Sequence, residues 1–317
     1  MRFGQLLLGL CAPLALVGAA AAQTPTTVPG VTVTAPSNLT PAQQVKRFGQ
    51  VDSKGRLARW GTPVCPVTAG LPDAFDAFID HRIRDVAEQV GAVAAPEKCS
   101  VNVLILITPQ AAAFTRKVVE LKSHALASGR WPVDKAKLRA FANDPNPVRW
   151  FYVSDTVATL GGSANALNIN TLSAAGAGSG LDQFFKSALP GPPQDSWVTP
   201  SRLKPAGEEA FTQVVIVVDA NRIAGLSAGQ ISDYLAMLAL AQVKAESSFA
   251  GTDTVLNLFA PGLDEAHRPT ALTLWDKAYL SALYKSDAQS SYTAQVSHIT
   301  TRIKDEAAQQ GGQAAPK

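Results

Sequence analysis

The stretch from residue 211 to residue 245 constrains the fold more than any other part of the sequence. Residues 214–218 form an unbroken run of β-branched apolar residues, which is typical of a strand buried on both faces. Residues 228–244 carry apolar side chains around almost the whole circumference of a helix, which predicts a helix through the middle of a domain. We therefore expect an α+β fold, with a mixed β-sheet packed against several α-helices and connected by long loops.

Shorter patterns predict the remaining elements. Apolar runs predict two further strands at residues 101–107 and 148–153. Helical spacing predicts helices over residues 72–90, 111–126, 135–142, 273–285 and 288–306. Capping patterns start two helices, with Ser227 and Gln230 at one and Thr273 and Asp276 at the other. In the first predicted helix the repeat consists of Phe75, Phe78, Ile79, Ile83, Val86 and Val90, and Gly91 ends it.

The N-terminus has the three parts of a secretory signal peptide. Arg2 supplies a charge, residues 6–17 are apolar, and small residues precede a cleavage site between Ala22 and Gln23. No later run reaches the roughly 18 apolar residues that a membrane helix needs. We therefore expect residues 1–22 to be removed and the mature chain, without a membrane span, to be periplasmic or secreted.

Composition divides the mature chain into three parts. Residues 23–57 are rich in Thr, Pro, Ala and Gln, which predicts a flexible lead-in. Residues 58–306 carry the periodic segments and are expected to form one globular domain, and residues 307–317 a disordered tail. Within the domain, the glycine-rich stretch 155–210 matches neither a phosphate loop nor a dinucleotide-binding motif, so it is predicted to be a loop whose role stays open.

Charge and cysteine content limit the function classes. The chain has 28 basic and 25 acidic residues, and the basic ones are scattered without interleaved aromatic residues, which argues against nucleic-acid binding. Cys65 and Cys99 are the two cysteines that remain after cleavage. In an oxidising compartment such a pair is most simply a disulfide, and the loop-closure model gives it about 3–4 kcal/mol of stabilisation.

The order of segments between residues 211 and 284 resembles that of zincin metalloproteases, in which a sheet precedes an active-site helix bearing the motif H-E-x-x-H. In that family a turn and a C-terminal helix follow the active-site helix. Here residues 253–259 would correspond to the turn and residues 272–284 to the C-terminal helix. The segment D-Y-L-A-M at the middle of the helix is also similar to one in a family of exported bacterial proteins without an assigned activity.

The zinc-binding motif itself is absent. Ser232 and Ala236 stand where the motif has histidines, Asp233 stands for the glutamate, and Gln242 stands at the third ligand position. Zinc needs imidazole, thiolate or carboxylate ligands, which Ser232 and Ala236 cannot supply. The resemblance therefore implies a degenerate active site in a non-catalytic domain without metal or cofactor. A binding or accessory role, with another envelope protein as one conceivable partner, would follow; a plain buried helix unrelated to proteases is equally open.

A serine hydrolase is the alternative. Residues 225–229 spell G-x-S-x-G, and Ser227 is followed by Asp253 or Asp264 and then by His267 or His298 in the order of a triad. However, a nucleophile elbow places its serine at the sharp end of a strand, whereas Ser227 has a simpler role as a helix N-cap.

A weak metal site is a further alternative, because Asp264, Glu265 and His267 are close together in the sequence. The four histidines are dispersed, however, and charged residues in a proline-flanked loop are usually solvated. We therefore expect no metal site. A third hypothesis is a binding protein that acts through residues 155–210, including Trp197. The sequence does not identify its ligand. The sequence favours a non-catalytic protein over an enzyme.

Overall fold

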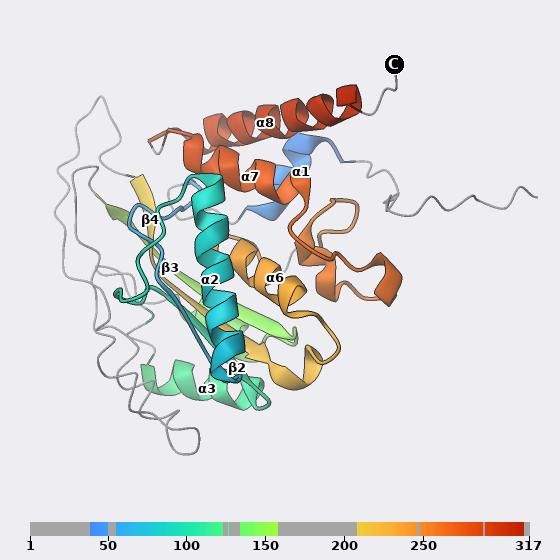
Figure 1. Cartoon of the computed structure of the whole chain (residues 1–317). Helices are drawn as coiled ribbons and strands as arrows, with labels where there is room; N and C mark the ends of the chain where they lie inside the picture. Colours follow the sequence, from blue (N-terminus) through green and yellow to red (C-terminus); the bar gives the residue numbers. More distant parts are fainter. Residues whose placement is uncertain are drawn as a thin grey trace, which may run out of the picture. The chain divides into compact units, whose positions relative to one another are not determined.

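A computed structural model of the chain describes residues 39–49, 55–122, 126, 134–157, 208–245, 248–287 and 289–313. All of them fall within one compact unit, Thr34–Lys317. The described residues form a mixed four-stranded sheet and seven α-helices, so the predicted α+β class is confirmed (Figure 1).

The strands are ordered β1-β2-β4-β3 across the sheet. β1 (Pro66–Ala69), β2 (Val103–Thr108) and β4 (Glu208–Asp219) are parallel, and β3 (Val148–Val157) runs antiparallel to β4 at the edge. The predicted strands correspond to β2, β3 and β4. β1 was not predicted, because its four residues are too few to display an alternation.

Helices cover both faces of the sheet. α2 (Asp73–Val90) and α6 (Ala228–Leu240) pack on one face, and α3 (Ala111–Lys122) and α4 (Lys135–Asn143) on the other. Alternate residues of β4 therefore enter two different cores. The larger core receives Val214, Ile216 and Val218, and the smaller core receives Val215 and Val217. Burial on both faces, as predicted for this strand, is confirmed.

Three more helices complete the larger core. α7 (Leu274–Lys285) contacts α8 (Tyr292–Gln313), and α8 contacts α1 (Pro41–Phe48). Figure 1 shows these three helices next to one another, with α2 and α6 below them in the view. Between α6 and α7 the chain forms two short 3-10 turns, Val255–Phe259 and Glu265–His267.

The predicted helix signals are confirmed. Ser227 and Gln230 form a capping box at α6, and Thr273 and Asp276 form one at α7. Gly91 ends α2 with a φ of 90°, a left-handed conformation that glycine adopts without a steric penalty.

The expectation of a flexible lead-in over residues 23–57 is wrong for residues 40–49 and for Leu57. Thr40 caps α1, and Val45 and Phe48 of this helix are buried together with Leu57. The Phe48 ring packs on the Trp275 ring, with centroids 4.9 Å apart. Two large side chains in a short polar segment are enough to anchor a helix when a preformed apolar surface receives them.

Two helix ends also differ from the prediction. α8 continues to Gln313, into the predicted tail, and α6 ends at Leu240 instead of near residue 244. Beyond α6 the chain becomes extended, and the carbonyl of Val243 accepts a hydrogen bond from the Trp150 indole at 3.0 Å. A tertiary contact thus ends this helix where the local sequence would allow it to continue.

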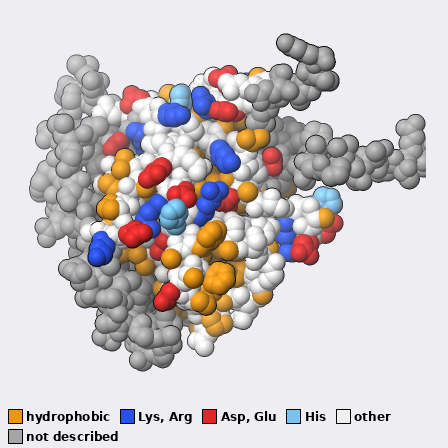
Figure 2. Space-filling model, viewed as in Figure 1, with side chains coloured by type: hydrophobic (Ala, Val, Ile, Leu, Met, Phe, Trp, Pro, Cys, Tyr) orange, Lys and Arg blue, Asp and Glu red, His pale blue; other side chains and the backbone are white. Residues whose placement is uncertain are grey.

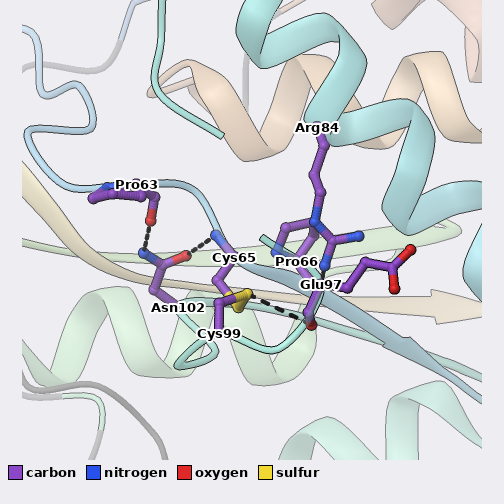
Figure 3. The surroundings of a disulfide bond; sticks show 7 residues. All are labelled: Pro63, Cys65, Pro66, Arg84, Glu97, Cys99 and Asn102. Atoms are coloured by element: carbon purple, nitrogen blue, oxygen red, sulfur yellow. Dashed lines mark hydrogen bonds between the residues drawn. A yellow bond between two sulfur atoms is a disulfide. The ribbon is translucent and has the colours of Figure 1, made fainter. Parts of the chain in front are cut away.

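The disulfide Cys65–Cys99 is formed, as predicted, and joins the chain just before β1 to the chain just before β2. Figure 3 shows the side chain of Asn102 beside it. The Asn102 amide accepts a hydrogen bond from the Cys65 N–H at 2.7 Å and donates one to the Pro63 carbonyl at 2.9 Å. The covalent bond and this amide together hold the two strand beginnings in place.

Candidate functional site

The middle of α6 contains the positions that the zincin resemblance assigns to the first two metal ligands. Ser232 and Ala236 both have no exposed surface. The Ser232 hydroxyl is directed back at its own helix, 2.8 Å from the Ala228 carbonyl oxygen and 3.1 Å from that of Gly229. Both positions are therefore closed to solvent, and the Ser232 hydroxyl is hydrogen-bonded within its own helix.

Asp233, at the position of the motif's glutamate, is held by an arginine. Its carboxylate accepts hydrogen bonds from Arg82 Nε at 2.5 Å and from Arg82 Nη2 at 3.2 Å. A third bond comes from the Leu272 N–H at 2.7 Å. The Asp233 side chain is buried, whereas 28% of the Arg82 side chain is exposed. The hydrogen bond to Asp233 raises the pKa of Arg82. This bidentate pair joins α2, α6 and the segment before α7, so Asp233 acts as a structural link.

Gln242 stands outside the helix, because α6 ends at Leu240. Its side-chain oxygen accepts a hydrogen bond from the Ala58 N–H at 3.1 Å, and the residue is buried. The fourth motif position thus ties the end of α6 to the chain before β1. Ser232, Asp233 and Ala236 lie within α6, Gln242 follows its end, and all four residues are buried.

A further carboxylate with several hydrogen bonds belongs to Asp276 in α7, which is completely buried. It accepts bonds from the Thr254 hydroxyl at 2.5 Å, the Val255 N–H at 2.8 Å and the Thr273 N–H at 2.9 Å. Burial raises its pKa to about 6, although these bonds act in the opposite direction. Sequence reasoning identified Asp276 only as a cap; the structure adds that it fixes the turn after α6.

A second perturbed carboxylate, Asp80, lies on α2. It accepts a hydrogen bond from the Thr68 hydroxyl at 2.7 Å, which links α2 to β1. Burial raises its pKa to about 7, against the opposing effects of Thr68 and Arg84. Asp80 and Asp276 contact different elements, so they are two separate structural groups and do not form a pair for acid–base chemistry.

The residues of the alternative triad are only partly brought together. His267 Nδ1 contacts Asp264, and both side chains are 66% exposed. The hydrogen bond to His267 lowers the pKa of Asp264. Ser227 is exposed and accepts the Gln230 N–H at 3.1 Å as the cap of α6. No hydrogen bond between Ser227 and His267 occurs among the contacts that the structure describes.

The other triad candidates lie elsewhere. Asp253 is exposed, and its carbonyl accepts a hydrogen bond from the Thr273 hydroxyl at 2.7 Å. His298 lies on the exposed side of α8. The acid–histidine half of a triad therefore exists at Asp264 and His267, but it is a solvated local pair within one short turn.

The described residues gather few of the side chains that bind metal ions in one place. No three His, Cys, Asp or Glu side chains in this part of the chain lie close enough together to bind one. His81 contacts Asp85 on the outer side of α2 at 3.0 Å, and both are partly exposed. His124, Trp197 and nearly all of the loop 155–210 lie outside the described residues. No described helix is long and apolar enough to cross a membrane.

Comparisons with known proteins give no relative for this chain: no family model matches, and no curated protein or solved structure gives a significant match.

Two surface features were not predicted from the sequence. The first is Arg82, whose partner Asp233 lies 151 residues away in the sequence, so that no local pattern could reveal the pair. The second is the exposure of Phe75 and Phe78, which is 52% and 47%. Their helical spacing placed them with Ile79 on the apolar side of α2. In the structure that side is covered only from Ile79 onward.

Proposed function

We propose that this chain is an exported, non-catalytic domain with a zincin-like frame and a binding or accessory role. The observation that carries the proposal is the closed interior of α6. Ser232 and Ala236 are buried, and the carboxylate of Asp233 is engaged by Arg82 and Leu272. A hydrolytic centre needs ligands and a base that a substrate can reach, and here those positions serve the stability of the fold.

The order of elements supports the frame. β4 leads into α6, a short turn at Val255–Phe259 follows, and α7 closes the domain. The zincin resemblance implies a sheet, a central helix, a turn and a closing helix in this order. The position of the turn adds to the likeness, because Asp276 of the closing helix fixes Thr254 and Val255.

Export is supported from two sides. The sequence of residues 1–22 has the pattern of a signal peptide. The disulfide Cys65–Cys99 fits an oxidising compartment such as a periplasm or the extracellular medium. In that setting a partner in the cell envelope is the natural candidate for an accessory domain.

Metal analysis tests the absence of a catalytic centre. Protein purified without a histidine tag is expected to contain well under one zinc ion per chain by elemental analysis, and to cleave no peptide library. His267→Ala is the control, because His267 belongs to the strongest remaining cluster of metal-type ligands in the sequence. Stoichiometric zinc and a peptidase activity that both disappear in this variant would contradict the proposal.

A serine hydrolase remains the alternative, and the contact between His267 and Asp264 is the observation in its favour. Labelling with a fluorophosphonate probe distinguishes a serine hydrolase from a non-catalytic domain. We expect no labelling, because the Ser227 hydroxyl is engaged as a helix cap. Labelling that is lost in Ser227→Ala and in His267→Ala, but kept in His298→Ala, would establish the hydrolase instead.

The binding role has its own test. Capture from an envelope extract with the intact chain, and with a variant whose residues 158–207 are replaced by a short linker, asks whether that segment recognises a partner. Residues 158–207 lie outside the described part of the chain, and β3 and β4, which flank them, pair at Val157 and Glu208. A short linker therefore joins neighbouring strand ends. Failure of both forms to retain any partner would remove the support for an accessory role.

A further inference from the structure

Asp276 joins two segments of the chain inside the larger core. It lies in the first turn of α7, and its partners Thr254 and Val255 lie at the start of the turn Val255–Phe259 that follows α6. Three apolar side chains of this turn are buried in the larger core. On the face drawn in Figure 2, Asp and Glu side chains lie at the surface among Lys and Arg. Asp276, by contrast, has no exposed surface, so water does not reach its carboxylate.

Asp276 also has no counter-charge, because no ion pair within the described part of the chain includes it. In the two segments that it joins, the charged residues Asp253 and Lys277 are exposed. The ion pairs on the helices that contact α7 involve other residues: Asp233 with Arg82 between α6 and α2, His81 with Asp85 on α2, and Arg302 with Glu306 on α8. A buried carboxylate without a counter-charge favours its neutral form, because ionisation places a charge in apolar surroundings.

The two oxygens of this carboxyl group have different partners. Oδ2 accepts the N–H groups of Val255 at 2.8 Å and of Thr273 at 2.9 Å, and a backbone N–H can only donate. Oδ1 lies 2.5 Å from the Thr254 hydroxyl, which can either donate or accept. A proton on Oδ1 can therefore be donated to the Thr254 oxygen while both backbone bonds to Oδ2 are kept. The hydrogen of the Thr254 hydroxyl then loses its acceptor, which costs less than burying an unpaired charge.

We propose that Asp276 is a proton-sensitive clasp, which holds the turn Val255–Phe259 on the core while Oδ1 carries a proton and releases it more readily when the carboxyl group is ionised. Ionisation leaves a negative charge in the core, and opening of the turn lets water reach that charge. The open state therefore prefers the ionised form, and the closed state prefers the neutral form. The backbone bonds to Oδ2 form in both protonation states, so pH changes how often the turn opens and leaves the closed structure unchanged.

The pH range of the clasp follows from the protonation of Asp276 in the closed and open states. Burial raises its pKa to about 6 in the closed chain, whereas an aspartate in water has a pKa of about 3.9. The closed state is therefore favoured most below about pH 4, and this advantage is lost as the pH rises through about 6. A difference of about two pKa units makes the opening equilibrium roughly a hundredfold larger at pH 7 than at low pH.

Hydrogen exchange of single backbone amides tests the clasp, with the amides of β4 as a reference for unfolding of the whole domain. Between pH 4 and pH 7 the protection factor of the Val255 amide, corrected for the intrinsic exchange rate, should fall at least about tenfold more than those of β4. Asp276→Asn should abolish this difference, because the amide side chain can accept from both N–H groups and donate to Thr254 but cannot ionise. Asp253→Asn is the matched control in the same segment and should behave like the wild type. A fall no larger than in β4, or one that persists in Asp276→Asn, would overturn the proposal.

A titration of the Asp276 carboxyl carbon by NMR tests where the proton resides. The midpoint is expected near pH 6, and a midpoint at or below about pH 4 would contradict the clasp, because the group would then be ionised throughout. Thr254→Val keeps the shape of the side chain but removes the hydroxyl that donates to the ionised Oδ1, so the midpoint should move to higher pH. An unchanged or lower midpoint in this variant would refute the pairing of Oδ1 with Thr254.

Discussion

α6 and α2 lie against each other on the same face of the sheet, yet they differ in what surrounds them. Every residue of α6 from Ile231 to Leu240 is buried, whereas five of the eighteen residues of α2 are buried. The helix that resembles an active-site helix is therefore the one that solvent does not reach. The helix that looked like an ordinary amphipathic element carries the exposed apolar surface. Of these two neighbouring helices, α6 therefore belongs to the core, whereas α2 carries exposed apolar side chains near its N-terminus.

The largest expected effect comes from truncating α6. Leu235→Ala should lower the free energy of unfolding by about 2–5 kcal/mol, because it removes a completely buried side chain and leaves a cavity. Urea unfolding followed by circular dichroism measures it. Leu280→Ala in α7 is an equally buried comparison. A loss below about 0.5 kcal/mol for Leu235→Ala would mean that α6 is not the centre of the core.

The ion pair between the two helices should give the next largest effect. Asp233→Ala is expected to lower the free energy of unfolding by about 2–3 kcal/mol, because it leaves Arg82 and the Leu272 N–H without their acceptor. Arg82→Met should also destabilise the fold, since the carboxylate stays buried. If the double variant loses less free energy of unfolding than the two single variants lose together, Asp233 and Arg82 are energetically coupled. Strict additivity would show that the pair does not join α2 to α6.

The pH dependence of stability reports on the inner flank of α2. The pKa of Asp80 is raised to about 7 in the folded chain, above its value of about 3.9 in an unfolded chain. Its contribution to stability is therefore present below about pH 4 and is lost as the pH rises through about 7. In the wild-type protein this effect should lower the free energy of unfolding by an amount on the order of 1–2 kcal/mol between about pH 4 and pH 7. The substitution Asp80→Asn should abolish that decrease. Unfolding curves of both proteins at several pH values measure it, and parallel pH profiles would refute the assignment to Asp80.

The smallest effect is expected at the exposed end of α2. Replacing Phe75 and Phe78 together by Ser should change the free energy of unfolding by less than about 0.5 kcal/mol, because solvent already reaches both rings. A loss comparable to that of Leu235→Ala would mean that both rings are covered, and the contrast between α2 and α6 would then disappear.

Local sequence patterns determined where several strands, helices and helix caps of this protein form. The β-branched run in β4, the all-round apolar helix α6 and the capping boxes at Ser227 and Thr273 are each encoded within a few neighbouring residues. Short-range hydrogen bonds and apolar periodicity suffice to predict them. The disulfide between Cys65 and Cys99 was predictable for a different reason, since two cysteines in an oxidising compartment allow one pairing.

Tertiary structure decided what those elements do. Whether Phe78 is covered depends on where the neighbouring elements end, and the partner of Asp233 comes from a helix 151 residues away. α6 ends early because the carbonyl of Val243 is engaged by Trp150, and α1 forms because Phe48 finds an aromatic surface made by α7. The sequence by itself determined where strands and helices can form, because that depends on adjacent residues. Which side chains are buried, paired or left exposed depends on contacts between distant segments, and only the folded chain brings those together.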